Sequence, residues 1–204
     1  MDFTAAAPLT YNHSTGGGAY NDRTVGRADD IVESLEGGDF SCGDTVTFLT
    51  QIRVDAGAAG AQTVRLRFEF TAHSTGQQGT ALVDNVNGVS AAINGSAIDS
   101  GTVDDGGSTP TPHDEFQNGA TWAKPTTFFR SVDVTDLEPA EKVVVRTDVA
   151  IVCNGESPTG NMQARLASAS VLAPAADTIS VGDQTVPFKR VGDIKPCDPE
   201  TCPP

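Results

Sequence analysis

Four cysteines are the residues of this 204-residue chain with the clearest capacity for chemistry. Thiols can bind a metal, attack a substrate or form disulfide bonds. Cys197 and Cys202 lie close together, but there is no second close pair and no histidine beside them, so their spacing is not that of a zinc site. Disulfide bonds are the better interpretation. They indicate an oxidising compartment outside the cytoplasm.

The positions of the other two cysteines in alternating apolar segments predict which cysteines pair. Residues at even spacing along a β-strand point to the same face, which we call sharing a parity. Cys42 shares its parity with Val46 and Phe48, and Cys153 shares its parity with Ile151. Both sulfur atoms are therefore expected to point into the core and to lock two opposed ribbons across it. The bond would close a loop of about 110 residues, worth roughly 4–5 kcal/mol in the chain-entropy treatment. The two C-terminal cysteines would then bond to each other.

Two alternatives to this pairing are open. The cysteines of the two strands could be buried free thiols, which would fit a reducing compartment. The C-terminal pair could instead bond to another subunit or to a following domain.

Oxygen-bearing side chains form two groups that could bind calcium. Asp84, Asn85 and Asn87 lie within four residues of each other, and Asp104 and Asp105 lie in a long predicted loop. Carboxylate and amide oxygens in glycine-containing loops suit Ca²⁺. The spacing of an EF-hand is absent, and the open alternative is that these side chains cap their own turns.

Candidates for ligand binding and catalysis are few. Trp122, with Phe116 and the same long loop, could form a carbohydrate-binding surface, although a tryptophan near Pro125 could equally fill the core. The three histidines are far apart in the sequence and have no metal-ligand spacing. The chain also lacks a G-x-S-x-G nucleophile motif and the Walker and Rossmann fingerprints. We therefore predict a protein that is not an enzyme.

Hydrophobic alternation predicts the elements that position these residues. Strands are expected at residues 44–54, 63–71, 127–135, 143–153 and 161–172, with edge strands at 81–93 and 178–189. The first two strands are expected to form a hairpin or a neighbouring pair. Residues 29–35 are the best candidate for a helix, of two turns at most.

Seven to ten strands without crossover helices predict an all-β fold, an antiparallel Ig-like or Greek-key β-sandwich. We divide the chain into an extended N-terminal arm (1–28), a sandwich domain (29–190) and a C-terminal tail or linker (191–204). The formal net charge of −14 disfavours binding to nucleic acids and to anionic membranes. No apolar run approaches the roughly 18 residues that would span a bilayer.

Two short motifs resemble a known family. Gly43–Phe48, with the sequence GDTVTF, resembles the G-D-x-V-x-[FY] strand opening of the Ig-like conserved-repeat domains of bacterial and archaeal cell-surface proteins. Asp136–Glu141 and the strand after it resemble a later corner of those domains. The resemblance covers residues 40–172 and implies a non-catalytic stalk, adhesive or filament module. The chain departs from a single repeat by its greater length and its cysteine pair.

These observations predict a secreted structural protein of the cell surface, either a filament or sheath subunit or an adhesin module. Its copies, or neighbouring domains of one protein, would associate by strand addition. Residues 1–28 or 178–189 would complete the sheet edge of a neighbour. The alternative is a carbohydrate- or calcium-binding module of a larger surface protein. Calcium is the one cofactor that the sequence suggests.

Overall fold

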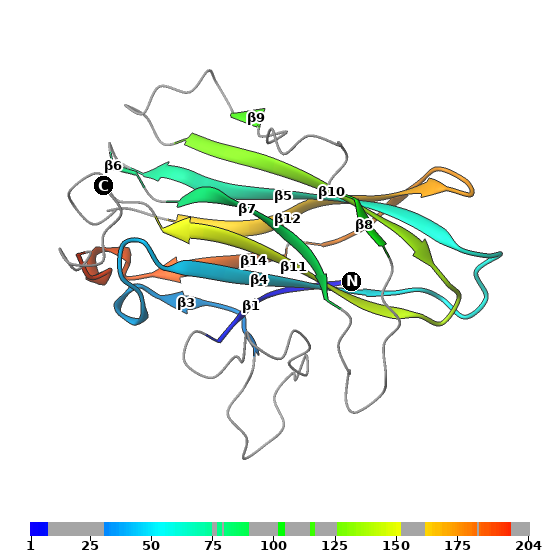
Figure 1. Ribbon diagram of the computed structural model, residues 1–204, viewed down its shortest axis with the longest axis horizontal. Coiled ribbons are helices and arrows are strands. Elements are labelled where there is room, and N and C mark those ends of the chain that lie inside the picture. Colours follow the sequence, from blue (N-terminus) through cyan, green and yellow to red (C-terminus); the bar gives the residue numbers. More distant parts are fainter. Residues whose placement is uncertain are drawn as a thin grey trace, which may run out of the picture.

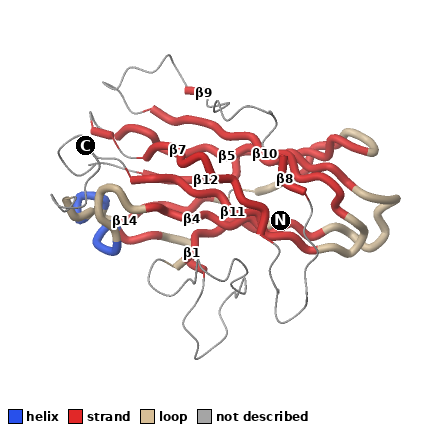
Figure 2. The backbone as a smooth tube through the Cα atoms, viewed as in Figure 1, coloured by secondary structure: helices blue, strands red, loops and turns tan. Residues whose placement is uncertain are grey.

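The described part of the chain is built almost entirely of β-strands. The computed structural model describes residues 1–7, 31–74, 77–78, 80–89, 102–104, 115–116, 126–151, 162–182 and 184–196. Figure 1 shows two layers of long strands running along the longest axis. The only helices in these ranges are two short 3-10 turns, η2 (Gly37–Asp39) and η3 (Val191–Asp193), which lie together at one end of the molecule (Figure 2).

The strands form one five-stranded and one nine-stranded sheet. The five-stranded sheet has the order β2 (Ile31–Val32), β1 (Asp2–Ala6), β4 (Thr45–Arg53), β11 (Lys142–Ile151) and β7 (Thr80–Val89). The main path of the nine-stranded sheet is β3 (Leu35–Glu36), β14 (Thr185–Lys189), β12 (Met162–Ala173), β5 (Gln62–Ser74), β10 (Thr126–Leu137) and β8 (Thr102–Asp104). Three short strands lie off this path: β13 (Asp177–Ile179) on β12, β6 (Gln77–Gln78) on β5 and β9 (Glu115–Phe116) on β10.

The inner faces of the two sheets share one apolar core. Phe48 of β4 packs on Phe70 of β5 with a centroid distance of 5.5 Å, and Phe188 of β14 lies 6.5 Å from Phe48. The predicted all-β sandwich is therefore confirmed. The strand pairs of the described residues are antiparallel except for β3 with β14, which is parallel. A Greek-key connection stays a prediction.

Alternation of apolar and polar residues accounts for which faces of the strands in the nine-stranded sheet are buried. On β5, Val64, Leu66, Phe68 and Phe70 are at most 4% exposed, as their shared parity predicts. The residues between them carry charge and lie on the outer face. On β12 the buried parity changes after Leu166, where the pairing register with β5 also shifts. A β-bulge of this kind moves the following side chains to the other face.

β4 departs from the predicted half-buried strand. Its core-facing residues are buried as expected, but Thr47, Leu49 and Gln51 on the opposite face are also at most 4% exposed. The alternating polar residues thus do not mark a solvent face here. This strand lies in the interior of its sheet, between β1 and β11.

Two predicted strand relationships are wrong. β4 and β5 do not form a hairpin or a neighbouring pair: they belong to opposite sheets, and residues 54–61 connect the two layers. β4 and β11, which lead to Cys42 and Cys153, are not opposed ribbons but antiparallel neighbours within one sheet. Parity alone shows that two strands share a core, but it does not show whether they lie in one sheet or in two.

Segments expected outside the sandwich contribute to it. Asp2–Ala6, assigned to the N-terminal arm, is a strand of the five-stranded sheet, while residues 8–28 lie outside the described residues. In the expected tail, Val191 and Ile194 are 5% and 2% exposed and belong to the core. The helix candidate at residues 29–35 is wrong where the structure describes it, because Ile31–Val32 and Leu35–Glu36 form the short strands β2 and β3.

Candidate strand-docking site

β1 pairs with one edge of β4. We call the site that holds it, formed by the backbone of Phe48–Gln51 and the rings of Phe48 and Phe68, the β1 groove. Asp2 to Ala5 pair in antiparallel register with Phe48 to Gln51. The ring of Phe3 stacks on Phe48 at 5.6 Å and 16°, and it packs against Phe68 of the other sheet at 5.7 Å. A five-residue strand thus supplies both backbone hydrogen bonds to one sheet and an aromatic side chain between the two.

Burial shows how deeply β1 is embedded. Phe3 is 5% exposed and Ala5 is fully buried, and both belong to the core. Thr4 and Ala6, on the other face of the strand, are also buried. The short side chains explain why β1 fits, since Ala5 allows close approach while Phe3 fills the space between the sheets. Removing β1 would expose the backbone of β4 and the rings of Phe48 and Phe68.

Two buried hydroxyl groups beside the Phe3–Phe48 stack have no hydrogen-bond partner. Thr50 lies opposite Phe3 and is 1% exposed, and Thr147 of β11 lies opposite Phe48 and is fully buried. Their Oγ1 atoms are unpaired. A buried, unpaired hydroxyl typically costs about 1–3 kcal/mol. The β1 groove is therefore tightly packed, but two buried hydroxyl groups beside the stack make no hydrogen bond.

A second pair of distant segments meets at the end of the molecule that carries η2 and η3. We call residues 35–42 with residues 188–195 the double-turn region. The two stretches run parallel: Phe188 and Lys189 pair with Leu35 and Glu36, and Ser41 bridges to Lys195 further on. The Lys195 amide donates to the carbonyl of Phe40 at 3.0 Å, and the Cys42 amide donates to the Lys195 carbonyl at 2.9 Å.

Gly37 allows the two turns to approach. A Cβ atom at this position would lie 2.3 Å from the carbonyl oxygen of Arg190 and 3.1 Å from the Cα of Val191. Both contacts are to backbone, which cannot move aside without displacing η3. At Gly38 the nearest atom to such a Cβ would be 3.9 Å away, an ordinary contact. The fit of the double-turn region thus depends on the missing side chain of one residue.

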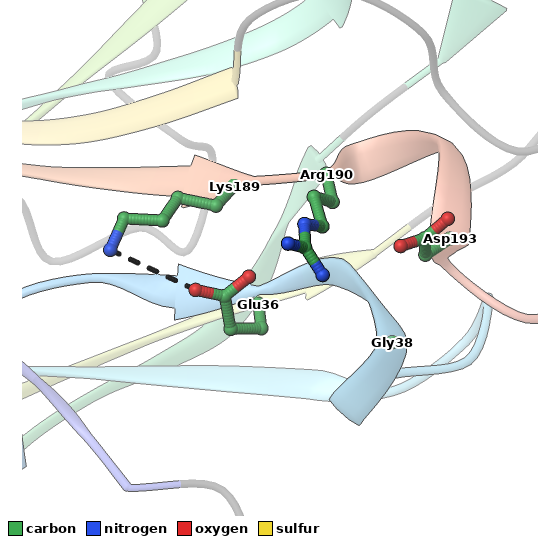
Figure 3. Close-up of a pocket in the computed structure, with 5 residues that line it drawn as sticks. All are labelled: Glu36, Gly38, Lys189, Arg190 and Asp193. Carbon is green, nitrogen blue, oxygen red and sulfur yellow. Dashed lines mark ion pairs between the residues drawn. The ribbon is translucent and has the colours of Figure 1, made fainter.

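A polar depression of about 470 Å³ lies on this region (Figure 3). Glu36, Gly38, Lys189, Arg190 and Asp193 line it. The Lys189 ammonium lies 3.7 Å from a Glu36 carboxylate oxygen, and both side chains are about half exposed, at 56% and 46%. Two acids and two bases on an open surface offer neither a nucleophile nor a net charge to attract an ion. We assign no chemistry to this depression.

Charged residues on the outer face of the nine-stranded sheet pair across strands. Arg65 of β5 donates two hydrogen bonds to the carboxylate of Asp133 on β10, at 2.6 and 2.7 Å. The hydrogen bond to Asp133 raises the pKa of the Arg65 guanidinium, so it stays charged. Arg165 of β12 pairs with Glu69 of β5.

Arg67, on the same outer face, stacks instead on an aromatic ring. Its guanidinium lies 4.0 Å from the ring centre of Phe129, a cation–π contact. Its arginine neighbours on that face, Arg65 and Arg165, are engaged in ion pairs within the sheet. We therefore do not read the outer face as an anion-binding surface.

Cys42 is the one cysteine within the described residues, and it is not a free thiol. It is 8% exposed and belongs to the core, as its parity predicts. Cys153, Cys197 and Cys202 lie outside the described residues, so both predicted pairings stay predictions. Because β4 and β11 are neighbours in one sheet, a Cys42–Cys153 bond would join strands of that sheet and would not lock two sheets together.

Two described segments that each end shortly before another cysteine make backbone contacts at Cys42 and Gly43. The Gly43 amide donates to the Ile151 carbonyl at 2.7 Å, and Ile151 is two residues before Cys153. Lys195, bonded to the Cys42 amide, is likewise two residues before Cys197. Cys153 and Cys197 themselves lie outside the described residues, so these contacts do not choose between them. We keep Cys42–Cys153 as the predicted pair and name Cys42–Cys197 as the alternative that peptide mapping would test.

The predicted calcium ligands fall on strands or outside the described residues. Asp84, Asn85 and Asn87 lie in β7, where residues 83–85 stand opposite a single residue of β11 at a register irregularity. Asp104 is in β8, at the position opposite Asp133, and Asp105 is not described. No group of three or more potential metal-ligating residues occurs in the described ranges. The calcium site stays an untested prediction.

The carbohydrate-binding surface predicted around Trp122 and Phe116 likewise stays a prediction. Trp122 lies outside the described residues, and Phe116 is placed only by its backbone in β9, opposite Phe128. Phe3, Thr50 and Thr147, by contrast, were not singled out from the sequence. The alternation of Phe3, Ala5 and Ala7 is the signal that could have identified β1, but alanine is too weakly hydrophobic to make it stand out.

Membrane-spanning helices and similarity to known proteins were both sought as indications of function. No helix in the described part of the chain has the length and apolarity needed to cross a bilayer. A comparison with known protein families and with curated proteins finds no match to this chain.

Proposed function

We propose that this chain is a non-catalytic structural module of an exported, cell-surface protein, and that it assembles through the edges of its sheets. The observation that carries the proposal is the β1 groove. Here a short segment that is distant in sequence completes a sheet edge and places Phe3 in the core. Strand addition uses the same chemistry between chains, with backbone hydrogen bonds for affinity and alternate side chains for specificity.

The form of the molecule supports a structural role. Its long strands carry a continuous apolar core, and its outer arginines are held by Asp133, Glu69 and the ring of Phe129. These features favour a rigid body. The resemblance of Gly43–Phe48 to surface-protein repeats points in the same direction, as does the engaged thiol of Cys42, which fits an oxidising compartment.

β7 offers a further edge for assembly. It is ten residues long and ends the five-stranded sheet, and no described strand pairs with its outer side. An unpaired edge of this length is a template for another chain. The irregularity at residues 83–85 would restrict which part of that edge another strand could use.

The test is self-association of the purified, oxidised chain. Light scattering after size-exclusion chromatography and negative-stain microscopy should reveal ordered oligomers or filaments as the concentration rises from about 10 μM to about 1 mM, the order of the effective concentration of a tethered segment. Leu172→Ser is the control, because Leu172 is the one large hydrophobic residue exposed among the described residues, at 38%. It should leave assembly unchanged. A chain that stays monomeric throughout would refute the proposal.

A further inference from the structure

We infer that the partner in this assembly is a second copy of the chain, and that the two copies exchange β1. This inference rests on the proposed function and names the segment that carries it. In the exchanged form, residues 2–6 of one copy would lie in the β1 groove of the next. The groove would make the same contacts as in the monomer, with Phe3 between Phe48 and Phe68.

The groove specifies its occupant closely. Its backbone edge, at Phe48 to Gln51, aligns four residues of β1, and its aromatic walls accept one ring. The side chain of Gln184 adds a contact, since its Nε2 donates to the Met1 carbonyl at 3.1 Å. Ala5 is fully buried, so a larger residue at that position of an incoming strand would not fit. The sequence DFTAA therefore suits this groove better than an arbitrary apolar strand.

The connection between β1 and the rest of the fold is long enough for exchange. Residues 7–30 separate β1 from its neighbour β2, although Ala6 and Ile31 lie opposite each other. A chain of that length can span at most about 80 Å. Covalent connectivity therefore does not confine β1 to its own groove, and exchange of an identical element is a low-cost route to oligomers.

Concentration decides between the two forms, because their groove contacts are the same. A tethered segment meets its own groove at an effective concentration on the order of millimolar. A second copy competes only when it approaches that concentration, as in a crowded surface layer. The unpaired hydroxyls of Thr50 and Thr147 beside the Phe3–Phe48 stack are common to both forms, so they do not shift this balance.

Engineered cysteines at one register pair test the exchange. Asp2 and Gln51 lie directly opposite each other, within the range of a cross-strand disulfide. One isotopically labelled copy carries Asp2→Cys, and an unlabelled copy carries Gln51→Cys. The two are mixed, unfolded and refolded together without reductant at a concentration on the order of 1 mM. We expect a disulfide-linked heterodimer, identified by mass.

Two controls keep the outcome decisive. Thr45→Cys replaces Gln51→Cys in one control, because Thr45 is exposed on β4 and is not opposite β1; this mixture should give at least tenfold less heterodimer. In the other, Asp2→Cys and Gln51→Cys in one chain lock β1 in its own groove, and assembly should be lost. Assembly that persists in the locked chain would overturn exchange but leave the proposed function standing. Absence of self-association in the unmodified chain would overturn both.

Discussion

Two regions hold sequence-distant segments in place by different physical means. In the β1 groove, Phe3 and Ala5 are buried between the sheets, and apolar packing supplies the main stabilisation. In the double-turn region, residues 188–195 lie against residues 35–42 through backbone hydrogen bonds and the close approach that Gly37 permits. An identical strand from a second copy would make the same contacts as the first attachment, and this is the basis of the proposed exchange. The second attachment depends on a backbone fit that only this pair of turns provides.

The cysteines make the difference between the regions larger. In the double-turn region the backbone amide of Cys42 donates to the Lys195 carbonyl, and Cys42 is not a free thiol. The β1 groove has no cysteine in its described residues, Met1–Ala6 and Phe48–Gln51. We therefore expect the double-turn region to be the fixed attachment and the β1 groove to be the exchangeable one.

The largest expected effect comes from the predicted disulfide between Cys42 and Cys153. Replacing Cys42 and Cys153 by alanine should lower the free energy of unfolding by about 4 kcal/mol, since the bond closes a long loop. Denaturant unfolding measures the change, and peptide mapping under non-reducing conditions identifies the bond. The control Cys197→Ala with Cys202→Ala should cost less, because that loop is short. A mapped Cys42–Cys197 bond would contradict the pairing and would place the covalent link within the double-turn region.

Phe3→Ala is the sharpest test of the β1 groove. Loss of a buried phenylalanine between Phe48 and Phe68 should destabilise the fold by about 3–5 kcal/mol in urea unfolding. Phe3→Leu keeps most of the volume and should cost less than about 1.5 kcal/mol. Equal effects of the two variants, or no effect of either, would show that β1 is not packed in its groove in solution.

Gly37→Ala tests the double-turn region. The added methyl group would meet the backbone of Arg190 at 2.3 Å, and overpacking of this kind typically costs about 1–3 kcal/mol. Gly38→Ala is the matched control and should be close to neutral. Thermal unfolding compares the two. If both variants were equally stable, the close fit of η2 against η3 would not be a source of stability.

Thr147→Val should stabilise the protein by about 1 kcal/mol, because it removes a buried hydroxyl that has no partner while keeping the shape of the side chain. Thr45→Val, at an exposed position of β4, should change little. Urea unfolding measures both. A loss of stability on Thr147→Val would mean that the hydroxyl is satisfied in solution, for example by a buried water molecule.

The smallest effect is expected on the outer face, away from both regions. The ion pair of Arg65 and Asp133 is partly exposed, with side-chain exposures of 47% and 14%, so a double-mutant cycle with Arg65→Gln and Asp133→Asn should give about 0.2–1 kcal/mol. Added salt should reduce this coupling. A coupling well above this range would show that the outer face contributes to stability as much as the double-turn region does.

The pH dependence of that pair follows from its raised arginine pKa. A group whose folded-state pKa is raised contributes stability that is complete below its unfolded pKa, which for arginine is far above neutral, and is lost as the pH rises through the folded value. Titration of Arg65 therefore adds no slope to stability near neutral pH. Unfolding of Arg65→Gln and of the unmodified chain at several pH values in that range should differ by a constant amount.

Parity in the sequence was a reliable guide to the core but not to strand neighbours. It correctly placed Val64, Leu66, Phe68 and Phe70 on one buried face, and it placed Cys42 in the core with Phe48. It failed for β4, whose second face is also buried, and for β1, whose alternation is carried largely by alanine. Alternation shows which face of a strand is apolar. Whether the other face is also buried depends on packing against segments that are far away in the sequence.

The site was less predictable than the fold. The sequence suggested residues 1–28 as a donor segment, but its pattern did not identify Asp2–Ala6 as the strand, Phe3 as the side chain or β4 as the edge. Those predicted calcium and carbohydrate residues that the structure describes lie on β7, β8 and β9 and not in the β1 groove, while Asp105 and Trp122 lie outside the described residues. A groove consists of one strand edge and the rings of two sheets, and no local pattern encodes that combination.

By itself, the amino-acid sequence determined the all-β class, the inward face of the main strands and the acidic surface, because alternation and charge are local properties of the chain. The tertiary structure decided that β4 and β5 lie in opposite sheets, that β4 and β11 are neighbours, and that β1 and residues 188–195 complete the fold. The physical reason is that a strand leaves its edge hydrogen bonds unsatisfied until a partner is chosen. That choice depends on the packing of the whole core.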